Sequence, residues 1–169
     1  MNTYSSVAIL IPSLNPDEKL LSLLADLREA AFEHIVVIND GSSADYDSYF
    51  EAARTQYGCT VLTHAVNQGK GRALKTAFHH VLTELPQCCS VTVDADGQHR
   101  IADIRAVAQE TMEHPEALIF GCRDFSPKTS GVPVRSRFGN VLTSHLYIFF
   151  CEVLAMFFKL GDFFSIIQS

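Results

Sequence analysis

The chain has 169 residues, of which 47% are hydrophobic and 19% charged, so it has the size and apolar content of one globular domain. Its 13 basic and 19 acidic residues give a formal net charge of -6, with no block of like charge. This balance argues against a basic nucleic-acid-binding arm, and we expect no nucleic-acid partner.

Short apolar runs alternate with amphipathic stretches along the chain. Runs that are apolar almost throughout are typical of strands covered on both faces, and they predict strands at 7–11, 35–38, 60–62, 91–93 and 117–120. Apolar residues at helical spacing predict helices at 17–31, 44–57, 71–85 and 101–113. Repeated strand–helix units predict an α/β fold with a mainly parallel, doubly wound sheet and helices on both faces.

The cysteines and the first residues bear on the cellular compartment. The five cysteines form no C-x-x-C pair, and an odd number cannot all pair within the chain. Residues 1–6 are polar and have no basic stretch leading into a long apolar one, so they do not resemble a secretory signal. We therefore expect reduced thiols and a cytoplasmic location.

The last 25 residues, 145–169, are dominated by Phe, Leu and Ile but are interrupted by Glu152, Lys159, Gly161 and Asp162. A bilayer span needs about 20 mostly apolar residues, so the interruptions favour a buried or interfacial helix. We interpret residues 1–144 as the core domain and 145–169 as an apolar C-terminal segment. An exposed apolar face of this size predicts contact with a membrane surface or a partner.

Three of the predicted strands run into polar segments, at 12–16, 39–43 and 94–99. Ligands of open parallel sheets bind beyond the carboxyl ends of the strands. The sequence therefore predicts a binding site at this edge of the sheet, with side-chain oxygens from three loops on one rim.

Asp94 and Asp96 directly follow the fourth predicted strand. Two carboxylates one residue apart can share Mg²⁺ or Mn²⁺, which prefers oxygen ligands and often completes its shell with substrate phosphates. Gln98 and His99 are further candidate ligands. A turn or a helix cap is the alternative interpretation of the same residues.

Asp40 and Lys70 lie in two further loops of this edge. Asp40 can accept hydrogen bonds from a ribose or a base edge, and this role is compatible with a turn that leads into a helix cap at Ser42 or Ser43. Lys70 lies in a glycine-containing segment before a predicted helix, where backbone amides can approach an anion. A helix-start turn with solvated cations is the simpler interpretation of that segment.

Arg123 follows the fifth predicted strand, and Lys128, Arg135 and Arg137 come soon after it. Guanidinium groups suit phosphate oxygens because of their forked donors. A solvated basic loop is the alternative for any one of these residues. Arg123 stands out because it leaves the same sheet edge as the aspartates.

Five motifs in order resemble the family 2 inverting glycosyltransferases: IPSLN at 11–15, VINDGS at 37–42, NxGKGxAL at 67–74, VDADGQH at 93–99 and GxR at 121–123. Their order and spacing are most similar to the branch of dolichyl-phosphate mannose synthase and polyprenyl-phosphate sugar transferases. The resemblance covers residues from about 7 to 140. It implies the GT-A type of α/β fold, with residues 1–144 as the nucleotide-sugar-binding core.

The resemblance also implies a nucleotide-diphosphate sugar donor, UDP- or GDP-linked, whose base and ribose lie against the loops after the first two strands. We assign donor binding to Pro12, Asn15, Asp40, Lys70 and Asp94.

By the same resemblance, Asp94 and Asp96 hold Mg²⁺ or Mn²⁺ on the diphosphate, and Gln98 joins them in the polyprenyl-phosphate branch. Arg123 and Arg137 face the phosphates. We therefore expect Asp96, Arg123 and Arg137 to be the catalytic residues, with the metal and the arginines neutralising charge on the departing nucleotide.

These features predict an enzyme that transfers a sugar, with inversion, to a polyprenyl phosphate or another lipid-linked or saccharide acceptor of the cell envelope. We expect it at the inner face of the cell membrane as a peripheral protein. The match ends after Asn140, so we expect the chain to be truncated on the acceptor side. The alternatives are a non-catalytic nucleotide-binding remnant and, less favoured, a sugar nucleotidyltransferase, whose Gly-rich, Arg-containing loop is missing from 12–16.

Overall fold

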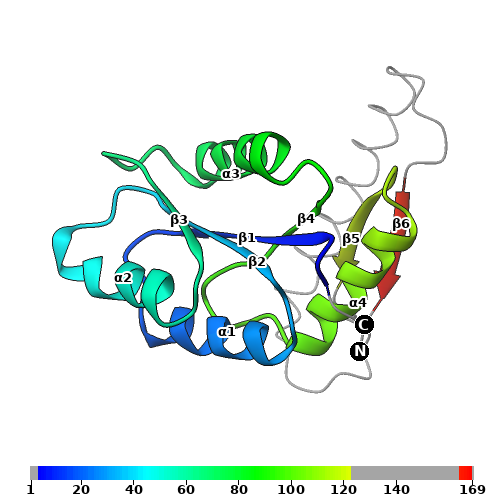
Figure 1. Cartoon of the computed structure of the whole chain (residues 1–169), viewed down its shortest axis with the longest axis horizontal. Coiled ribbons are helices and arrows are strands. Elements are labelled where there is room, and N and C mark those ends of the chain that lie inside the picture. The colour runs from blue at the N-terminus through cyan, green and yellow to red at the C-terminus, as the bar shows by residue number, and fades with distance from the viewer. Residues whose placement is uncertain (1–3, 123–163, 169) are drawn as a thin grey trace, which may run out of the picture. The chain divides into compact units, whose positions relative to one another are not determined.

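The computed structural model describes residues 4–122 and 164–168 (Figure 1). The chain divides into two compact units, residues 1–113 and 114–169. The elements of the first unit are β1 (Val7–Ser13), α1 (Glu18–Glu29), β2 (His34–Asn39), the 3-10 helix η1 (Ala44–Tyr46), α2 (Asp47–Thr55), β3 (Thr60–Thr63), α3 (Lys70–Glu84), β4 (Cys89–Thr92) and α4 (Ile101–Glu113).

The first unit is built on a four-stranded sheet of order β3-β2-β1-β4 in which every neighbouring pair is parallel. Ile9 of the central strand β1 is in register with Ile35 on one side and with Val91 on the other. Each strand is connected to the next through a helical segment, as parallel pairing requires. The predicted α/β class and the parallel sheet are confirmed.

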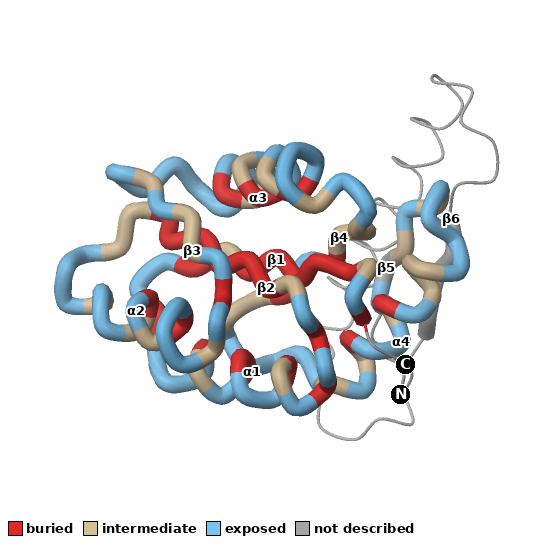
Figure 2. Tube along the Cα trace, in the orientation of Figure 1, coloured by how far each residue is buried: buried red, intermediate tan, exposed pale blue. Residues whose placement is uncertain are grey.

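Helices cover both faces of this sheet, and α3 lies across the face opposite to α1 and α2 (Figure 1). Strand β1 is buried along almost its whole length, as Figure 2 shows in red. Its side chains alternate between two cores: Ile9 and Ile11 belong to the larger cluster, whereas Ala8 and Leu10 belong to the cluster under α3. This burial on both faces explains why residues 7–12 of the strand are all apolar.

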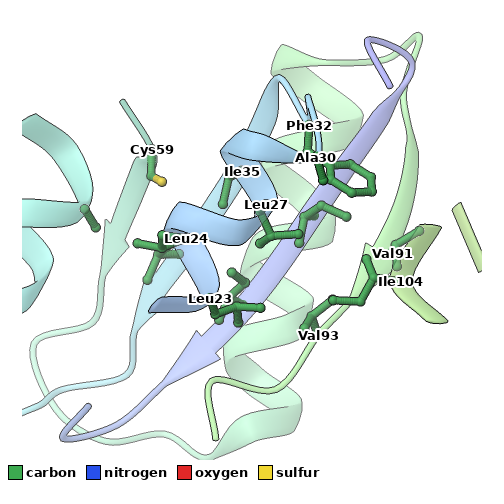
Figure 3. Packing of buried hydrophobic residues seen from close by; sticks show 14 of the residues in the cluster. Leu23, Leu24, Leu27, Ala30, Phe32, Ile35, Cys59, Val91, Val93 and Ile104 are labelled. Atoms are coloured by element: carbon green, nitrogen blue, oxygen red, sulfur yellow. The ribbon is translucent and has the colours of Figure 1, made fainter. Parts of the chain in front are cut away.

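The larger cluster joins α1, α2 and α4 to the sheet, and Figure 3 shows Leu23, Leu24 and Leu27 of α1 among its members, with Ile35 of β2 and Val93 after β4. Leu24 and Leu27 have no exposed surface. Truncating a leucine buried in this way to alanine costs about 2–5 kcal/mol. The packing of α1 on the sheet is therefore a major source of stability for the first unit, and so for the loops at the carboxyl edge of the sheet.

The helix ends follow local chemistry. The Asp17 side chain accepts a hydrogen bond from the Lys19 backbone N–H at 2.9 Å, which caps the start of α1. The helix ends two residues before the predicted limit, because Ala31 adopts a left-handed φ of 64°. The helix predicted over 44–57 is divided into η1 and α2, and Tyr46, the last residue of η1 and the N-cap of α2, has φ -100° and ψ 0°.

The second unit contains β5 (Leu118–Cys122) and β6 (Phe164–Gln168), which pair in parallel with Leu118 opposite Phe164. The expectation of a helix is therefore wrong for residues 164–168, where consecutive isoleucines favour a strand. The predicted boundary between residues 144 and 145 lies outside the described residues. In the described ranges, no helix has the length and apolarity needed to cross a membrane.

Candidate active site

A cleft of about 500 Å³ lies beyond the carboxyl ends of β1, β2 and β4. It is lined by residues of four loops: Pro12, Ser13, Leu14, Asn15, Pro16, Asp17, Lys19, Asp40, Asn67, Gly69, Lys70, Asp94, Ala95 and Asp96. All five donor-binding residues predicted from the sequence are in this set. The parallel sheet brings these loops together because its strands all end at the same edge.

Asp40 is the most buried charged group of the cleft, with 3% of its surface exposed. Its carboxylate accepts hydrogen bonds from the backbone amides of Gln68 at 3.0 Å and Gly69 at 2.8 Å, and it lies 2.7 Å from His64 Nδ1. Burial by itself raises the pKa of Asp40, but the contacts with Gln68, His64 and Gly69 outweigh it and hold the pKa below its ordinary value. The carboxylate is therefore an anionic anchor for the loop before α3.

His64 connects this anchor to α3. Its Nε2 lies 2.9 Å from the Thr76 hydroxyl, while its backbone N–H donates to the Asn39 carbonyl at 2.9 Å. His64 Nδ1 donates to the Asp40 carboxylate, and the contact of Nε2 with the Thr76 hydroxyl satisfies the second ring nitrogen. Sequence reasoning missed His64, although it directly follows β3 and so belongs to the same sheet edge as Asp40.

The loops after β1 and β2 are hydrogen-bonded to each other. The backbone N–H of Asn15 donates to Ser42 Oγ at 2.8 Å, and Asn15 Oδ1 accepts from the Ser43 backbone at 3.3 Å. Asn15 has a left-handed φ of 49°, a conformation that asparagine tolerates better than most residues. Two residues earlier in the chain, Ser13 Oγ is buried and has no hydrogen-bond partner among the described residues.

The two candidate metal ligands, Asp94 and Asp96, line the cleft. Asp94 Oδ1 is 2.6 Å from Lys70 Nζ, and both side chains are substantially exposed. Asp96 Oδ1 accepts a hydrogen bond from the Gln98 backbone N–H at 3.0 Å, which holds the turn after the strand. The two aspartates offer the hard oxygen ligands that Mg²⁺ or Mn²⁺ prefers, so their chemistry fits either ion once the Lys70 ammonium leaves Asp94.

Three further predicted site residues, Gln98, Arg123 and Arg137, are not among the described residues that line the cleft. The Gln98 side chain is exposed on the turn that follows Asp96. Arg123 and Arg137 lie outside the described residues.

The family Glycosyl transferase family 2 matches residues 8–168 of the chain, which is nearly all of it. The chain belongs to glycosyl transferase family 2. This membership confirms the family that the five motifs resemble.

Two archaeal relatives match much of the chain. An uncharacterized protein of Methanocaldococcus jannaschii is 29% identical over 135 residues, which are 79% of this chain and 54% of the relative. The UDP-N-acetylglucosamine--dolichyl-phosphate N-acetylglucosaminyltransferase of Methanococcus voltae is 24% identical over 149 residues, which are 80% of this chain and 59% of that enzyme. The chain thus spans little more than half the length of these relatives.

Among solved structures, the chain is similar to the S. aureus TarS fragment of residues 1–349, with a TM-score of 0.52 and 21% identity. The similarity covers 76% of this chain and 38% of that one. At this identity the likeness concerns the fold alone, and together with the family it confirms the GT-A type of α/β fold.

Proposed function

We propose that the chain carries the donor site of an enzyme that transfers a sugar, with inversion, from a nucleotide-diphosphate donor to a polyprenyl phosphate or a related acceptor. One observation carries this proposal: Asp40, Lys70, Asp94 and Asp96 converge on one cleft at the carboxyl edge of the sheet. The cleft volume of about 500 Å³ is within the usual range for small-molecule sites.

The base and ribose of the donor belong against the loops of Pro12, Asn15 and Asp40. In this arrangement Asp40 also contributes to donor binding indirectly. Its carboxylate accepts hydrogen bonds from the Gln68 and Gly69 amides and so fixes the loop beside the cleft. The ammonium of Lys70 exchanges its contact with Asp94 for one with the donor diphosphate. Because the donor is UDP- or GDP-linked, the negative charge that must be balanced is the same for either base.

Charge balance explains the proposed metal. Two unit charges about 4 Å apart interact by about 4 kcal/mol at an effective dielectric constant of about 20, so the rim carboxylates repel a bare diphosphate strongly. Mg²⁺ or Mn²⁺ on Asp94 and Asp96, with Gln98 as a further ligand, would neutralise charge on the departing nucleotide. We assign the same electrostatic role to Arg123 and Arg137.

The acceptor oxygen attacks the anomeric carbon on the face opposite to the diphosphate. The bond between that carbon and the diphosphate oxygen breaks, its electrons leave with the nucleotide, and the configuration inverts. A phosphate acceptor is already an anion and needs little help from a general base. The dolichyl-phosphate acceptor in the name of the Methanococcus voltae relative supports a lipid phosphate over a saccharide. It also supports a peripheral location at the inner face of the cell membrane.

The test is a calorimetric titration of UDP and GDP into the parent chain, Asp96→Ala and Asp40→Ala, each with and without Mn²⁺. Asp96→Ala should abolish the metal dependence of binding and leave the fold nearly intact, because its side chain is exposed. Asp40→Ala should weaken binding with or without metal, because it removes the anchor of the loop before α3.

Melting curves of both variants control for unfolding. Nucleotide binding to Asp96→Ala with unchanged metal dependence would favour the simpler interpretation of residues 94–96 as a structural turn.

The alternative function for the same cleft is a nucleotide-binding module without turnover. A radiolabelled-sugar assay with polyprenyl phosphate separates the two. Transfer to the lipid supports the enzyme, whereas nucleotide binding without transfer or donor hydrolysis supports the module.

A further inference from the structure

Helix α3 exposes an apolar stripe beside its buried face. Phe78 is 40% exposed and Leu82 is 74% exposed, and Leu74, which is half-buried, lies one turn before Phe78. Residues four apart are neighbours on a helix surface, so these three side chains are contiguous. The buried face that packs on the sheet consists of Ala73, Ala77 and Val81. Isolated exposed apolar residues need no explanation, but a contiguous row on one helix is typical of a binding surface.

The same helix is basic in an acidic protein. It carries Lys70, Arg72 and Lys75 against one acidic residue, Glu84, whereas the whole chain has a net charge of -6. Lys70 is paired with Asp94. Arg72 and Lys75 are exposed, and their side chains form no ion pair with the described part of the chain. Helical geometry places both on the side of the stripe away from the sheet.

We propose that this α3 surface, formed by Leu74, Phe78 and Leu82 with Arg72 and Lys75, docks on an anionic lipid bilayer. Apolar side chains at the acyl boundary and cations at the headgroups are how amphipathic helices lie on membranes. Charge complementarity identifies the occupant, because an anionic surface repels a protein of net charge -6 except where cations gather.

Docking through α3 would also bring the cleft close to the membrane. Lys70 lines the cleft at the start of the helix, and Leu82 lies 12 residues further on, about 18 Å along the helix axis. The cleft is therefore within one helix length of the docked residues, where a lipid-linked phosphate presents its headgroup. The docking itself does not depend on the proposed transfer reaction, so either can fail without the other.

The first test is co-sedimentation of the full chain with vesicles of phosphatidylcholine, with and without phosphatidylglycerol. We expect binding that requires phosphatidylglycerol and weakens as salt is added. The double variant Arg72→Gln/Lys75→Gln should bind roughly tenfold more weakly or worse. The double variant Phe78→Gln/Leu82→Gln should lose at least roughly tenfold in affinity as well.

Matched controls make the same chemical changes elsewhere. Arg105→Gln removes an exposed arginine from α4, whose buried residues belong to the core on the other sheet face, and Leu118→Gln replaces a 53% exposed leucine of β5. Both should bind vesicles like the parent chain.

A second test uses fluorescence. The chain has no tryptophan, so Leu82→Trp introduces a single reporter. Its emission should shift to the blue with phosphatidylglycerol vesicles and be quenched by brominated lipid, whereas Leu118→Trp should change in neither respect.

The proposal is overturned if the parent chain does not bind the anionic vesicles, or if Phe78→Gln/Leu82→Gln binds them as tightly as the parent. The second result would assign membrane contact to another segment, such as residues 145–169. Unshifted emission of vesicle-bound Leu82→Trp would also overturn the proposal. So would variants that change only the oligomeric state of the protein and not its vesicle binding, because the α3 surface would then be a contact between copies of the chain. Unchanged melting curves and nucleotide binding would show that the variants retain the fold and the cleft.

Discussion

The loops after β2 and β3 approach each other closely at Gly41. This residue has φ +74°, and a Cβ atom there would lie 2.3 Å from the backbone nitrogen of Asn67 and 2.3 Å from the carbonyl carbon of Val66. Both neighbours are backbone atoms, so neither can give way by changing rotamer. We expect Gly41→Ala to lower the free energy of unfolding by about 3 kcal/mol or more in urea denaturation, because strained φ and a steric clash act together.

Gly71 is the matched control for Gly41. It lies in α3, and a Cβ atom built there meets nothing within 4 Å. Gly71→Ala should therefore raise the free energy of unfolding by about 0.5–1 kcal/mol, since alanine favours the helix. Equal changes in the free energy of unfolding for the two substitutions would show that the close backbone approach at residue 41 does not determine the stability of the loop.

Asp40 predicts a particular dependence of stability on pH. Its folded pKa lies below the ordinary value of 3.8, so its ionised form stabilises the fold. This contribution is complete above the unfolded pKa and is lost as the pH falls through the folded pKa. From about pH 5 to about pH 3, the free energy of unfolding should therefore fall more steeply for the parent chain than for Asp40→Asn. Parallel curves in urea denaturation would contradict the assignment.

The individual site residues differ in how far the sequence could locate them. Asp40, Asp94 and Asp96 each follow a predicted strand, and parallel topology alone brings strand ends to one edge. The contacts of Asp40 with His64 and of Asp94 with Lys70 could not be predicted, because each joins two loops whose backbone paths the local sequence does not determine.

Among the helices and strands, Arg28 connects the last turn of α1 to the segments that follow α1 and α2. Its guanidinium donates to the carbonyls of Tyr57 at 2.6 Å and of Phe32, Glu33 and Gly58 at 2.9 Å. A lysine ammonium cannot reproduce this planar set of donors. Arg28→Lys should therefore lower the free energy of unfolding by about 1–3 kcal/mol.

Arg105 provides the control for Arg28. It is exposed on α4, and its side chain makes no hydrogen bond with the described residues. Arg105→Lys should change the free energy of unfolding by less than about 0.5 kcal/mol. An Arg28→Lys variant as stable as this control would show that water replaces the lost donors.

The elements themselves follow from the sequence to within a few residues. The helix predicted over 101–113 has the bounds of α4, because its apolar residues repeat at helical spacing. Strand β4 begins at Cys89, two residues before the predicted strand, because its backbone pairs with β1 from Val7 onwards whatever the polarity of its side chains. The order β3-β2-β1-β4 depends on contacts between distant segments, which no local pattern contains.

In the described part of the chain, both core clusters and the cleft lie within the first unit. The buried residues of both core clusters fall between Tyr4 and Ala108, and the residues that line the cleft fall between Pro12 and Asp96. A chain that ends after residue 116 therefore keeps every one of these groups. The shortened chain lacks Arg123 and Arg137, which we assign to the donor phosphates, so its donor site carries less positive charge than that of the full chain.

We expect this shortened chain, residues 1–116, to unfold cooperatively on heating and to bind UDP or GDP in the presence of Mn²⁺. Loss of two charge-assisted contacts to phosphate should weaken binding relative to the full chain by roughly 1.5–3 kcal/mol for each arginine that reaches the donor. Measuring nucleotide binding to Arg123→Gln and Arg137→Gln in the full chain would show whether one arginine or both account for the lost affinity. Equal affinity of the shortened and full chains, with both variants unchanged, would remove the arginines from the donor site. A shortened chain without a cooperative transition would instead show that the first unit needs residues beyond 116 to fold.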